Sequence, residues 1–321
     1  MEEQKNTAEI SRVLVTGAAG FIGSHTCDAL LQKGKTVAGI DNLSTGSLAN
    51  LSDAQAQDAF SFHQADICET GEIAKLFTDF QPDAVIHLAA LVSVPIAEKN
   101  PEENYRANIL GTKTVAQAAA ACTTSRIVFA SSAAVYGNSD HLPLSEEEST
   151  NPINQYGKAK LEAESLLLPY EKSHGMIPTC LRFFNVYGPR QDPSSPYSGV
   201  ISIFSMACRN GNPVTIYGDG HQTRDFVFVK DIARAVVASA TNTMLPGGIY
   251  NLCSGNGITL LELLETMKTI HQDIPEPLFK EKREGDLRHS LGDPSRARRI
   301  LGFSVTTGFS EGILKLQTSR Q

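Results

Sequence analysis

Three absences narrow the classes of protein to which this chain of 321 residues can belong. Its six cysteines are scattered without a Cys-x-x-Cys pair, which is typical of small buried residues in a reducing compartment. No apolar run approaches the ~18 residues of a membrane span, and the polar, acidic N-terminus is unlike a signal peptide. The net charge of −7 disfavours a broad nucleic-acid surface. We therefore expect a cytoplasmic protein that binds neither membrane nor nucleic acid.

One segment departs from the acidic average. Basic residues recur between Lys280 and Arg299, and acidic residues lie among them. Two interpretations stay open here, a solvated charged face and an anion-binding pocket.

Apolar strand-like segments alternate with helical stretches along the first part of the chain. Strands are expected at 12–16, 35–41, 60–66, 84–88, 126–131 and 179–184. Helices are expected up to about residue 32 and near 70–80, 102–121 and 154–173, the last ended or kinked by Pro169. This alternation predicts an α/β fold, a doubly wound parallel sheet covered by helices on both faces.

After residue 184 the pattern changes, because proline and glycine become frequent and the strands become short. We expect residues 1–184 to form one domain and 185–321 a smaller α/β substrate-binding domain, with further helices near 259–271 and 295–301. The strand at 225–229 and the helix from Asp231 are expected to return to the main sheet. The two domains are therefore expected to be interleaved, with residues of about 225–250 belonging to the first domain.

Three glycines, Gly17, Gly20 and Gly23, join the first strand to the first helix. A phosphate needs backbone N–H groups close by, and a Cβ would obstruct that approach. Glycines alone would be explained by a structural turn, but Asp41 ends the second strand 18 residues after Gly23. An acid at about that distance binds the ribose of a dinucleotide and repels the 2′-phosphate of NADP. The sequence therefore predicts a Rossmann-type domain that binds NAD.

Tyr156 and Lys160 stand four residues apart and share one face of the predicted helix. A lysine cation one turn away favours a phenolate, so this pair could take a proton from a sugar or alcohol hydroxyl. The same spacing also arises by chance on amphipathic helices. The remaining motifs decide between these interpretations.

Together, the motifs resemble the extended short-chain dehydrogenase/reductase family, above all its nucleotide-sugar epimerases. The resemblance extends over most of the chain and is far more specific than any single motif. The motifs are Val15-Thr-Gly-Ala-Ala-Gly-Phe-Ile-Gly-Ser, Asp41-Asn42, Asp66-Ile67, His87-Leu-Ala-Ala90, Ser131-Ser-Ala-Ala-Val-Tyr-Gly137, Tyr156-x-x-x-Lys160, Arg182-Phe-Phe-Asn-Val-Tyr-Gly-Pro-Arg190, Gly218-Asp-Gly-His-Gln-Thr-Arg-Asp225 and Arg283-Glu-Gly-Asp-Leu-Arg-His-Ser290.

The resemblance implies a catalytic set of Ser132, Tyr156 and Lys160. Ser132 would hydrogen-bond the sugar O4, Tyr156 would be the acid/base, and Lys160 would hold the nicotinamide ribose and lower the tyrosine pKa. NAD would be contacted by Gly17, Gly20, Phe21, Ile22, Gly23, Asp41, Asn42, Asp66, Ile67, Leu88, Ala89, Ala90, Asn108, Tyr156 and Lys160. Asp66 could equally be an ordinary acid at a strand end.

The resemblance also implies a UDP-sugar site and no metal. Asn185 would lie on the phosphate side, Arg224 and Arg283 would clamp the diphosphate, and Asp286 would contact the ribose. As alternatives, Asn185 could be a turn residue and Arg283 a surface charge. The substrate set is Ser93, Ser132, Asn185, Gly199, Thr215, Ile216, Arg224, Arg283, Asp286 and Ser290. A homodimer through the helices near 102–121 and 154–173 is expected, as in the family.

The reaction type follows from two alanines. Where dehydratase relatives carry two acids for elimination, this chain has Ala133 and Ala134, and alanine cannot transfer a proton. A 4-epimerase that oxidises C4 and reduces it again is therefore expected, ahead of a dehydratase, a net oxidoreductase or an NAD sensor. In the family the position matching Ser290 lies beside the sugar C2 substituent, so the resemblance implies that the small Ser290 and Gly199 admit UDP-N-acetylhexosamines beside UDP-hexoses. A UDP-uronate stays open, because Arg182, Arg190 or Arg288 could meet its carboxylate.

Overall fold

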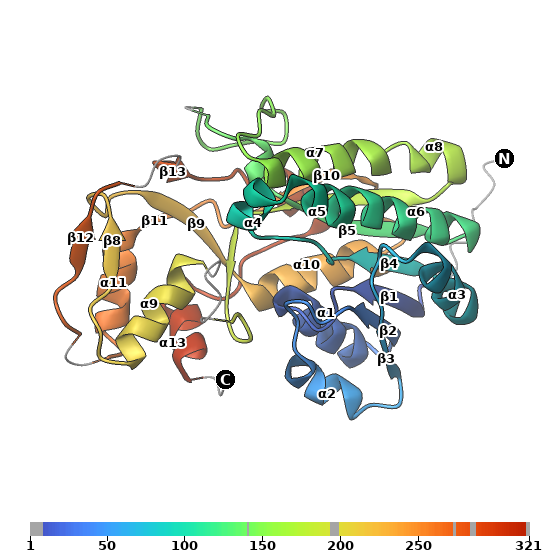
Figure 1. Ribbon diagram of the computed structural model, residues 1–321, viewed down its shortest axis with the longest axis horizontal. Helices are drawn as coiled ribbons and strands as arrows, with labels where there is room; N and C mark the ends of the chain where they lie inside the picture. Colours follow the sequence, from blue (N-terminus) through green and yellow to red (C-terminus); the bar gives the residue numbers. More distant parts are fainter. Residues whose placement is uncertain (1–8, 140, 193–198, 272–273, 283–286, 319–321) are drawn as a thin grey trace.

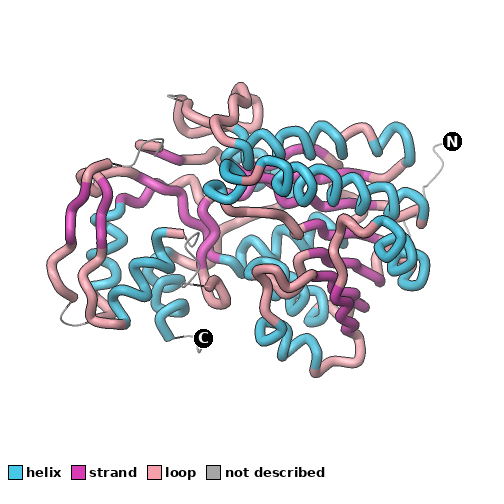
Figure 2. Tube along the Cα trace, in the orientation of Figure 1, coloured by secondary structure: helices cyan, strands magenta, loops and turns pink. Residues whose placement is uncertain are grey.

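A seven-stranded parallel sheet is the centre of the larger part of the molecule (Figures 1 and 2). The computed structural model describes residues 9–139, 141–192, 199–271, 274–282 and 287–318. The strand order is β10-β6-β5-β4-β1-β2-β3, and every neighbouring pair is parallel. The strands are β1 (Arg12–Thr16), β2 (Thr36–Asp41), β3 (Phe60–Gln64), β4 (Ala84–His87), β5 (Arg126–Ser132), β6 (Ile177–Phe183) and β10 (Gly248–Leu252).

Helices cover both faces of this sheet, and each face has its own apolar core. One layer contains α1 (Phe21–Gln32), α10 (Val229–Thr241) and α12 (Ser295–Leu301). The opposite layer contains α3 (Thr70–Phe80), α6 (Gly111–Ala121) and α7 (Gln155–Leu167). Because both faces are covered, the central strands are apolar throughout; Val13, Leu14 and Val15 of β1 are all fully buried. The predicted α/β fold class is confirmed.

Short elements complete this larger part. They are the 3-10 helices η1 (Leu48–Leu51) and η3 (Ala133–Val135), the α-helices α2 (Ser52–Gln55), α4 (Val94–Lys99), α5 (Pro101–Tyr105) and α8 (Tyr170–His174), and the π-helical segment η2 (Arg106–Leu110). The expected helix at 102–121 is thus α5, η2 and α6 in succession. Pro169 lies between α7 and α8, as its fixed φ predicts.

The smaller part packs around a separate apolar core. It contains β7 (Asn185–Tyr187), β8 (Thr215–Tyr217), β9 (Thr223–Phe228), β11 (Gly257–Thr259), β12 (Leu278–Lys280), β13 (His289–Ser290), α9 (Val200–Arg209), α11 (Leu260–Lys268) and α13 (Phe309–Thr318). Strands β11, β9 and β13 are neighbours, β7 also pairs with β9, and β12 pairs with β8. In Figure 1 this part lies to the left of the seven-stranded sheet.

One expectation about the chain path was wrong. The strand predicted at 225–229 is β9, which belongs to the smaller sheet, because its neighbours are β7, β11 and β13. The helix after it, α10, does return to the main sheet, and the unpredicted β10 then pairs with β6. The domain boundaries at 184 and at about 225–250 stay a prediction.

The homodimer was expected to form through the helical segments near 102–121 and 154–173. Helices α5 and α7 of these segments lie side by side in Figure 1. Tyr105 and Leu110 in the first segment are apolar side chains that are 48% and 43% exposed. The homodimer stays a prediction. No helix among the described residues has both the length and the apolar character needed to cross a bilayer.

Candidate active site

The turn between β1 and α1 is built for close approach to its backbone. A Cβ on Gly23 would lie 1.9 Å from the carbonyl oxygen of Gly17, and one on Gly17 would lie 2.7 Å from the amide nitrogen of Ala89. Gly17 also has a φ of +70°, a conformation that glycine adopts without strain. No side chain among the described residues caps α1 at Gly20. The first-turn N–H groups, including those of Phe21 and Ile22, therefore suit a diphosphate.

Asp41 lies at the carboxyl end of β2 beside this turn. Its carboxylate accepts hydrogen bonds from the backbone N–H groups of Ala19 (3.0 Å) and Leu43 (2.8 Å). Burial raises the pKa of Asp41, and these backbone donors act against that shift. The structure thus places the acid next to the glycine turn, where a ribose would follow the diphosphate.

The other residues predicted for NAD line the same edge of the sheet. Leu88, Ala89 and Ala90 follow β4, and Ala89 contacts the turn at Gly17. Asn108 is buried and exchanges two 3.0 Å hydrogen bonds with the backbone of Leu91. Its amide therefore fixes the segment that follows β4.

Asp66 and its neighbours lie after β3. The Asp66 carboxylate pairs with Arg106 at 2.9 Å and accepts a 3.5 Å hydrogen bond from Asn42. Ile67 is buried and packs in the core that α3 and α6 share. The Asp66 carboxylate thus has two side-chain partners in the structure. Its predicted contact with the adenine stays a prediction.

The proposed catalytic residues converge where β5 meets α7. Ser132 ends β5; its hydroxyl accepts from the N–H of Ala134 at 3.2 Å and acts to lower the pKa of the half-buried Tyr156. Lys160 is one turn further along α7, 3% exposed, and its ammonium donates to the carbonyl of Ala130 at 2.8 Å. Nζ of Lys160 lies 5.8 Å from the centre of the Tyr156 ring. The spacing of Tyr156 and Lys160 on α7 and the packing of α7 on β5 therefore bring the three residues together.

Burial dominates the titration of this group. The pKa of Tyr156 is raised because burial disfavours the phenolate, and the hydrogen bond with Ser132 opposes the shift. Burial lowers the pKa of Lys160 to about 7, and the charge of Glu164 acts to raise it. The resemblance implied a tyrosine pKa lowered by Lys160; here it is raised, because the burial of Tyr156 outweighs the groups that favour the phenolate.

The residues predicted for the substrate come from the smaller part and from α4. Ser290 on β13 stands opposite Arg224 on β9 in the parallel register. Asn185 opens β7, and its amide donates to the backbone carbonyl of Asp225 at 3.2 Å. The remaining positions are Ser93 at the N-cap of α4, Gly199 at the N-cap of α9, and Thr215 and Ile216 on β8.

For three of the predicted substrate residues the position in the structure limits what can be said. The Ile216 side chain is fully buried in the smaller core, so only its backbone is left for a ligand. Arg283 and Asp286 lie outside the described residues.

Asp225 organises this side of the site, although no role was predicted for it. Its fully buried carboxylate accepts hydrogen bonds from the N–H and hydroxyl of Ser254 and from the N–H groups of Gly255 and Gly292. Asp225 thereby ties together β9 and the turns that follow β10 and β13. Its place directly after Arg224 was the available sequence signal.

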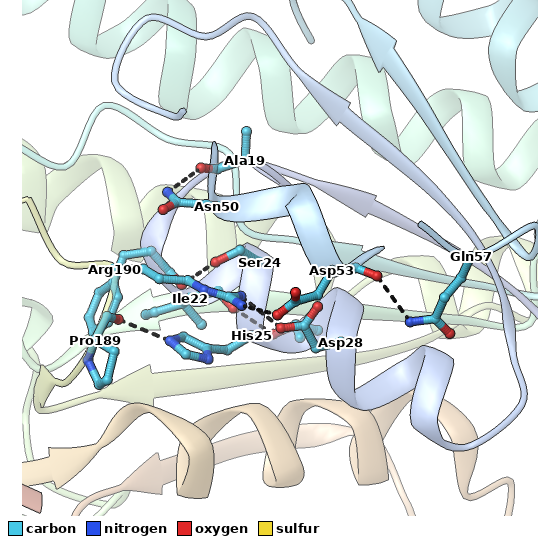
Figure 3. Close-up of polar contacts among 12 residues, drawn as sticks. Ala19, Ile22, Ser24, His25, Asp28, Asn50, Asp53, Gln57, Pro189 and Arg190 are labelled. Carbon is cyan, nitrogen blue, oxygen red and sulfur yellow. Dashed lines mark hydrogen bonds and ion pairs between the residues drawn. The ribbon is translucent and has the colours of Figure 1, made fainter. Parts of the chain in front are cut away.

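A second unpredicted cluster ties the segment after β7 to the cofactor side (Figure 3). Arg190 pairs with Asp28 of α1 at 2.7 Å and with Asp53 of α2 at 3.4 Å. His25 of α1 lies 2.9 Å from the carbonyl oxygen of Pro189, and burial lowers its pKa to about 4. A neutral His25 can donate to this carbonyl. The chain entering the smaller part is thus anchored on α1.

The sequence of this chain is similar to those of known proteins that bind NAD or are named as epimerases. Residues 13–253 match the model of the NAD dependent epimerase/dehydratase family. A UDP-glucose 4-epimerase of Mycolicibacterium smegmatis is 38% identical over 305 residues, which cover 95% of this chain and 96% of that protein.

Solved structures show the same likeness. A UDP-N-acetylglucosamine 4-epimerase of Methanobrevibacter ruminantium, in complex with UDP-N-acetylmuramic acid, superposes with a TM-score of 0.90 at 35% identity, covering 97% of this chain and 98% of that one. A UDP-glucose 4-epimerase of Thermus thermophilus in complex with NAD gives 0.85 at 35% identity, covering 95% and 97%. The chain therefore belongs to the NAD-dependent epimerase/dehydratase family, and NAD is its cofactor.

Proposed function

We propose that the protein is a 4-epimerase of UDP-sugars. The observation that carries this proposal is the convergence of Ser132, Tyr156 and Lys160 at the carboxyl edge of the sheet, beside the glycine turn. Relatives that resemble the chain over nearly their whole length are named as epimerases of UDP-glucose and UDP-N-acetylglucosamine.

In this mechanism Tyr156 is the acid/base, Ser132 hydrogen-bonds the sugar, and the Lys160 ammonium would hold the nicotinamide ribose. The Tyr156 oxygen takes the proton from O4 as C4 is oxidised, and Ser132 hydrogen-bonds the same oxygen of the sugar. NAD supplies the hydride acceptor and donor and, when oxidised, a positive charge that favours the phenolate. The 4-keto sugar turns about its diphosphate linkage, Tyr156 returns the proton on reduction, and no external electron acceptor is consumed.

The place of the two alanines supports epimerisation over elimination. Ala133 and Ala134 form η3 directly after Ser132, and the backbone of Ala134 packs against Gly157 at the start of α7. No carboxylate comes from these positions to take a C5 proton beside Tyr156. A dehydratase would need such a group.

Three ion pairs favour a neutral sugar over a uronate. Arg182 pairs with Glu164, Arg190 with Asp28, and Arg288 with Asp219 through two hydrogen bonds of 2.6 and 3.0 Å. Each of these three arginines already has a carboxylate partner. We therefore propose UDP-hexoses and UDP-N-acetylhexosamines as the substrates.

The function can be tested with purified protein and a panel of UDP-sugars. We expect NMR to show C4 epimers of UDP-glucose and UDP-N-acetylglucosamine formed without added electron acceptor. UDP-glucuronate is the matched negative substrate, because it differs from UDP-glucose at C6. Accumulation of a dehydrated 4-keto sugar, or of NADH in step with product, would overturn the proposal.

Ser290 offers a test of substrate size. Replacing Ser290 with tyrosine should lower turnover of UDP-N-acetylglucosamine about tenfold or more while UDP-glucose turnover is largely kept, because the ring fills space near the C2 substituent. The measurement is kcat/KM for both sugars, and Ser290→Ala is the matched control. Equal losses for the two sugars would show that Ser290 does not set substrate size.

A further inference from the structure

A buried ion pair lies directly behind the proposed catalytic residues. Glu164 is one helical turn beyond Lys160 on α7, and its side chain is 2% exposed. Arg182 of β6 binds this carboxylate through Nε at 2.9 Å and Nη2 at 2.7 Å, and its side chain is 3% exposed. This pairing of two planar groups fixes both of them in position.

The same carboxylate reaches the strand that ends in Ser132. The Ser131 hydroxyl donates to Glu164 at 2.5 Å, and Ser131 stands opposite Arg182 in the β5–β6 register. Glu164 thereby joins α7, which carries Tyr156 and Lys160, to the strand that carries Ser132. Together with the hydrogen bond from Lys160 to Ala130, this contact links α7 to β5 on the side of the catalytic residues.

The network continues to the edge of the sheet. The Arg182 guanidinium lies 4.7 Å from the centre of the Tyr136 ring, and the Tyr136 hydroxyl donates to Asn251 of β10 at 2.7 Å. Asn251 in turn donates to the carbonyl of Leu144 and, through its backbone N–H, to Glu146. The Tyr136 ring, which Asn251 holds in place, therefore also contacts Arg182.

Glu164 is also a negative charge one helical turn from Lys160, and its charge acts to raise the pKa of the Lys160 ammonium. His87 on β4 is held between Thr16 and Thr112, and burial lowers its pKa to about 3, so it is neutral. The other charged or titratable groups brought by α7 and the elements that pack on it are Tyr156, Lys158 and Glu162 on α7 itself, Arg126 on β5, Cys180 and Arg182 on β6, Glu98 and Lys99 on α4, Glu102, Glu103 and Tyr105 on α5, Arg106 on η2 and Lys113 on α6.

We propose that the Glu164–Arg182 pair positions the reaction centre, with Glu164 holding Lys160 in its ammonium form and Arg182 fixing the Glu164 carboxylate. This inference rests on the proposed function, because it assigns the pair to a reaction at Tyr156. Burial lowers the pKa of Lys160 to about 7, and Glu164 is the group that raises it. Both are positioning residues, since neither reaches the substrate edge.

The test is the pH dependence of Glu164→Gln, which keeps the size of the side chain and removes its charge. Activity that needs the ammonium is lost as pH rises through the pKa of Lys160. Without Glu164 that pKa falls, so the alkaline limb of kcat should move about one unit or more to lower pH. Glu162→Gln is the matched control, because Glu162 is on the same helix but faces solvent.

A second readout does not depend on the reaction. In NAD-loaded protein labelled at lysine Cε, NMR gives the titration midpoint of Lys160, assigned by its loss in Lys160→Met. We expect the midpoint to fall in Glu164→Gln together with the kinetic limb. If the wild-type protein epimerised no UDP-sugar, the proposed function would fail, while this midpoint would still measure the effect of Glu164 on Lys160.

A double variant separates positioning from stability. Glu164→Gln alone leaves Arg182 buried without its anion and lowers the melting temperature, whereas Glu164→Gln with Arg182→Gln removes both charges. We expect the double variant to regain most of the melting temperature and to keep the shifted Lys160 midpoint. A wild-type midpoint in both variants would show that the pair serves stability alone and would overturn the proposal.

Discussion

Replacing Tyr156 with phenylalanine is expected to lower kcat for UDP-sugar epimerisation by about 10²–10⁴-fold, the usual contribution of a positioned acid/base. The substitution removes a hydroxyl and keeps the ring beside Lys160. Binding of NAD should persist, since the glycine turn and Asp41 are untouched. Initial rates give kcat, and the absorbance of nucleotide released on denaturation gives the NAD content.

Tyr105→Phe is the matched control for this loss, because the same hydroxyl is removed from a tyrosine that is 48% exposed on α5. Its activity, NAD content and melting temperature should equal those of the wild-type protein. A Tyr156→Phe enzyme that keeps full activity would exclude Tyr156 as the acid/base. Loss of NAD together with activity would instead indicate a role in cofactor binding.

The raised pKa of Tyr156 gives this prediction a pH dependence. The phenolate is the base, so activity should rise as pH rises through the tyrosine pKa. The ammonium of Lys160 is lost at the alkaline side. Burial therefore moves the two pKa values apart, that of Tyr156 upward and that of Lys160 down to about 7, and the positive charge of bound oxidised NAD would act to lower the tyrosine pKa again.

Local signals were enough to predict the larger part of the fold. Each of the strands β1 to β6 is a short apolar run followed by a turn signal and a helical stretch, so its existence can be predicted without knowledge of its partners. The glycine turn and Asp41 could be predicted for the same reason, since the positions that bind the cofactor follow directly from strand ends.

Strand β10 and the pairing of β9 could not be predicted in this way. Gly247 and Gly248 precede Ile249-Tyr250-Asn251, and such glycines indicate a loop from sequence alone. Strand β9 ends in the apolar run Phe226-Val227-Phe228, which resembles a main-sheet strand, and its place in the smaller sheet is decided by its partners β7, β11 and β13. Partner choice is a property of the whole fold and is invisible to local periodicity.

Site residues could be predicted from the sequence where they lie together in one motif. Tyr156 and Lys160 are read from one helix, whereas Glu164 and Arg182 come from a helix and a strand 18 residues apart, and their meeting depends on how α7 packs on β6. The spacing Tyr156, Lys160, Glu164 on one helical face was the available signal. The pKa of Tyr156 was predicted in the wrong direction because burial is not visible in sequence.

Replacing Gly23 with alanine is expected to abolish retention of NAD. The new Cβ would lie 1.9 Å from the Gly17 carbonyl oxygen and 2.8 Å from its carbon, so the turn between β1 and α1 has to move. Both contacts are with backbone, which cannot rotate away as a side chain can. The displaced turn no longer presents its N–H groups to a diphosphate, and overpacking of this kind costs about 1–3 kcal/mol of stability.

The matched control is Gly71→Ala, a glycine in α3 where an added Cβ meets no atom within 4 Å. Alanine favours a helix over glycine by about 0.5–1 kcal/mol, so this variant should keep NAD and a melting temperature at least as high as the wild-type value. NAD released on denaturation and the melting temperature measure both variants. A turn that binds phosphate through backbone N–H groups has no side chain with which to compensate for a displacement. A Gly23→Ala protein with stoichiometric NAD would therefore show that the turn tolerates displacement and that the cofactor is held mainly through Asp41 and α7.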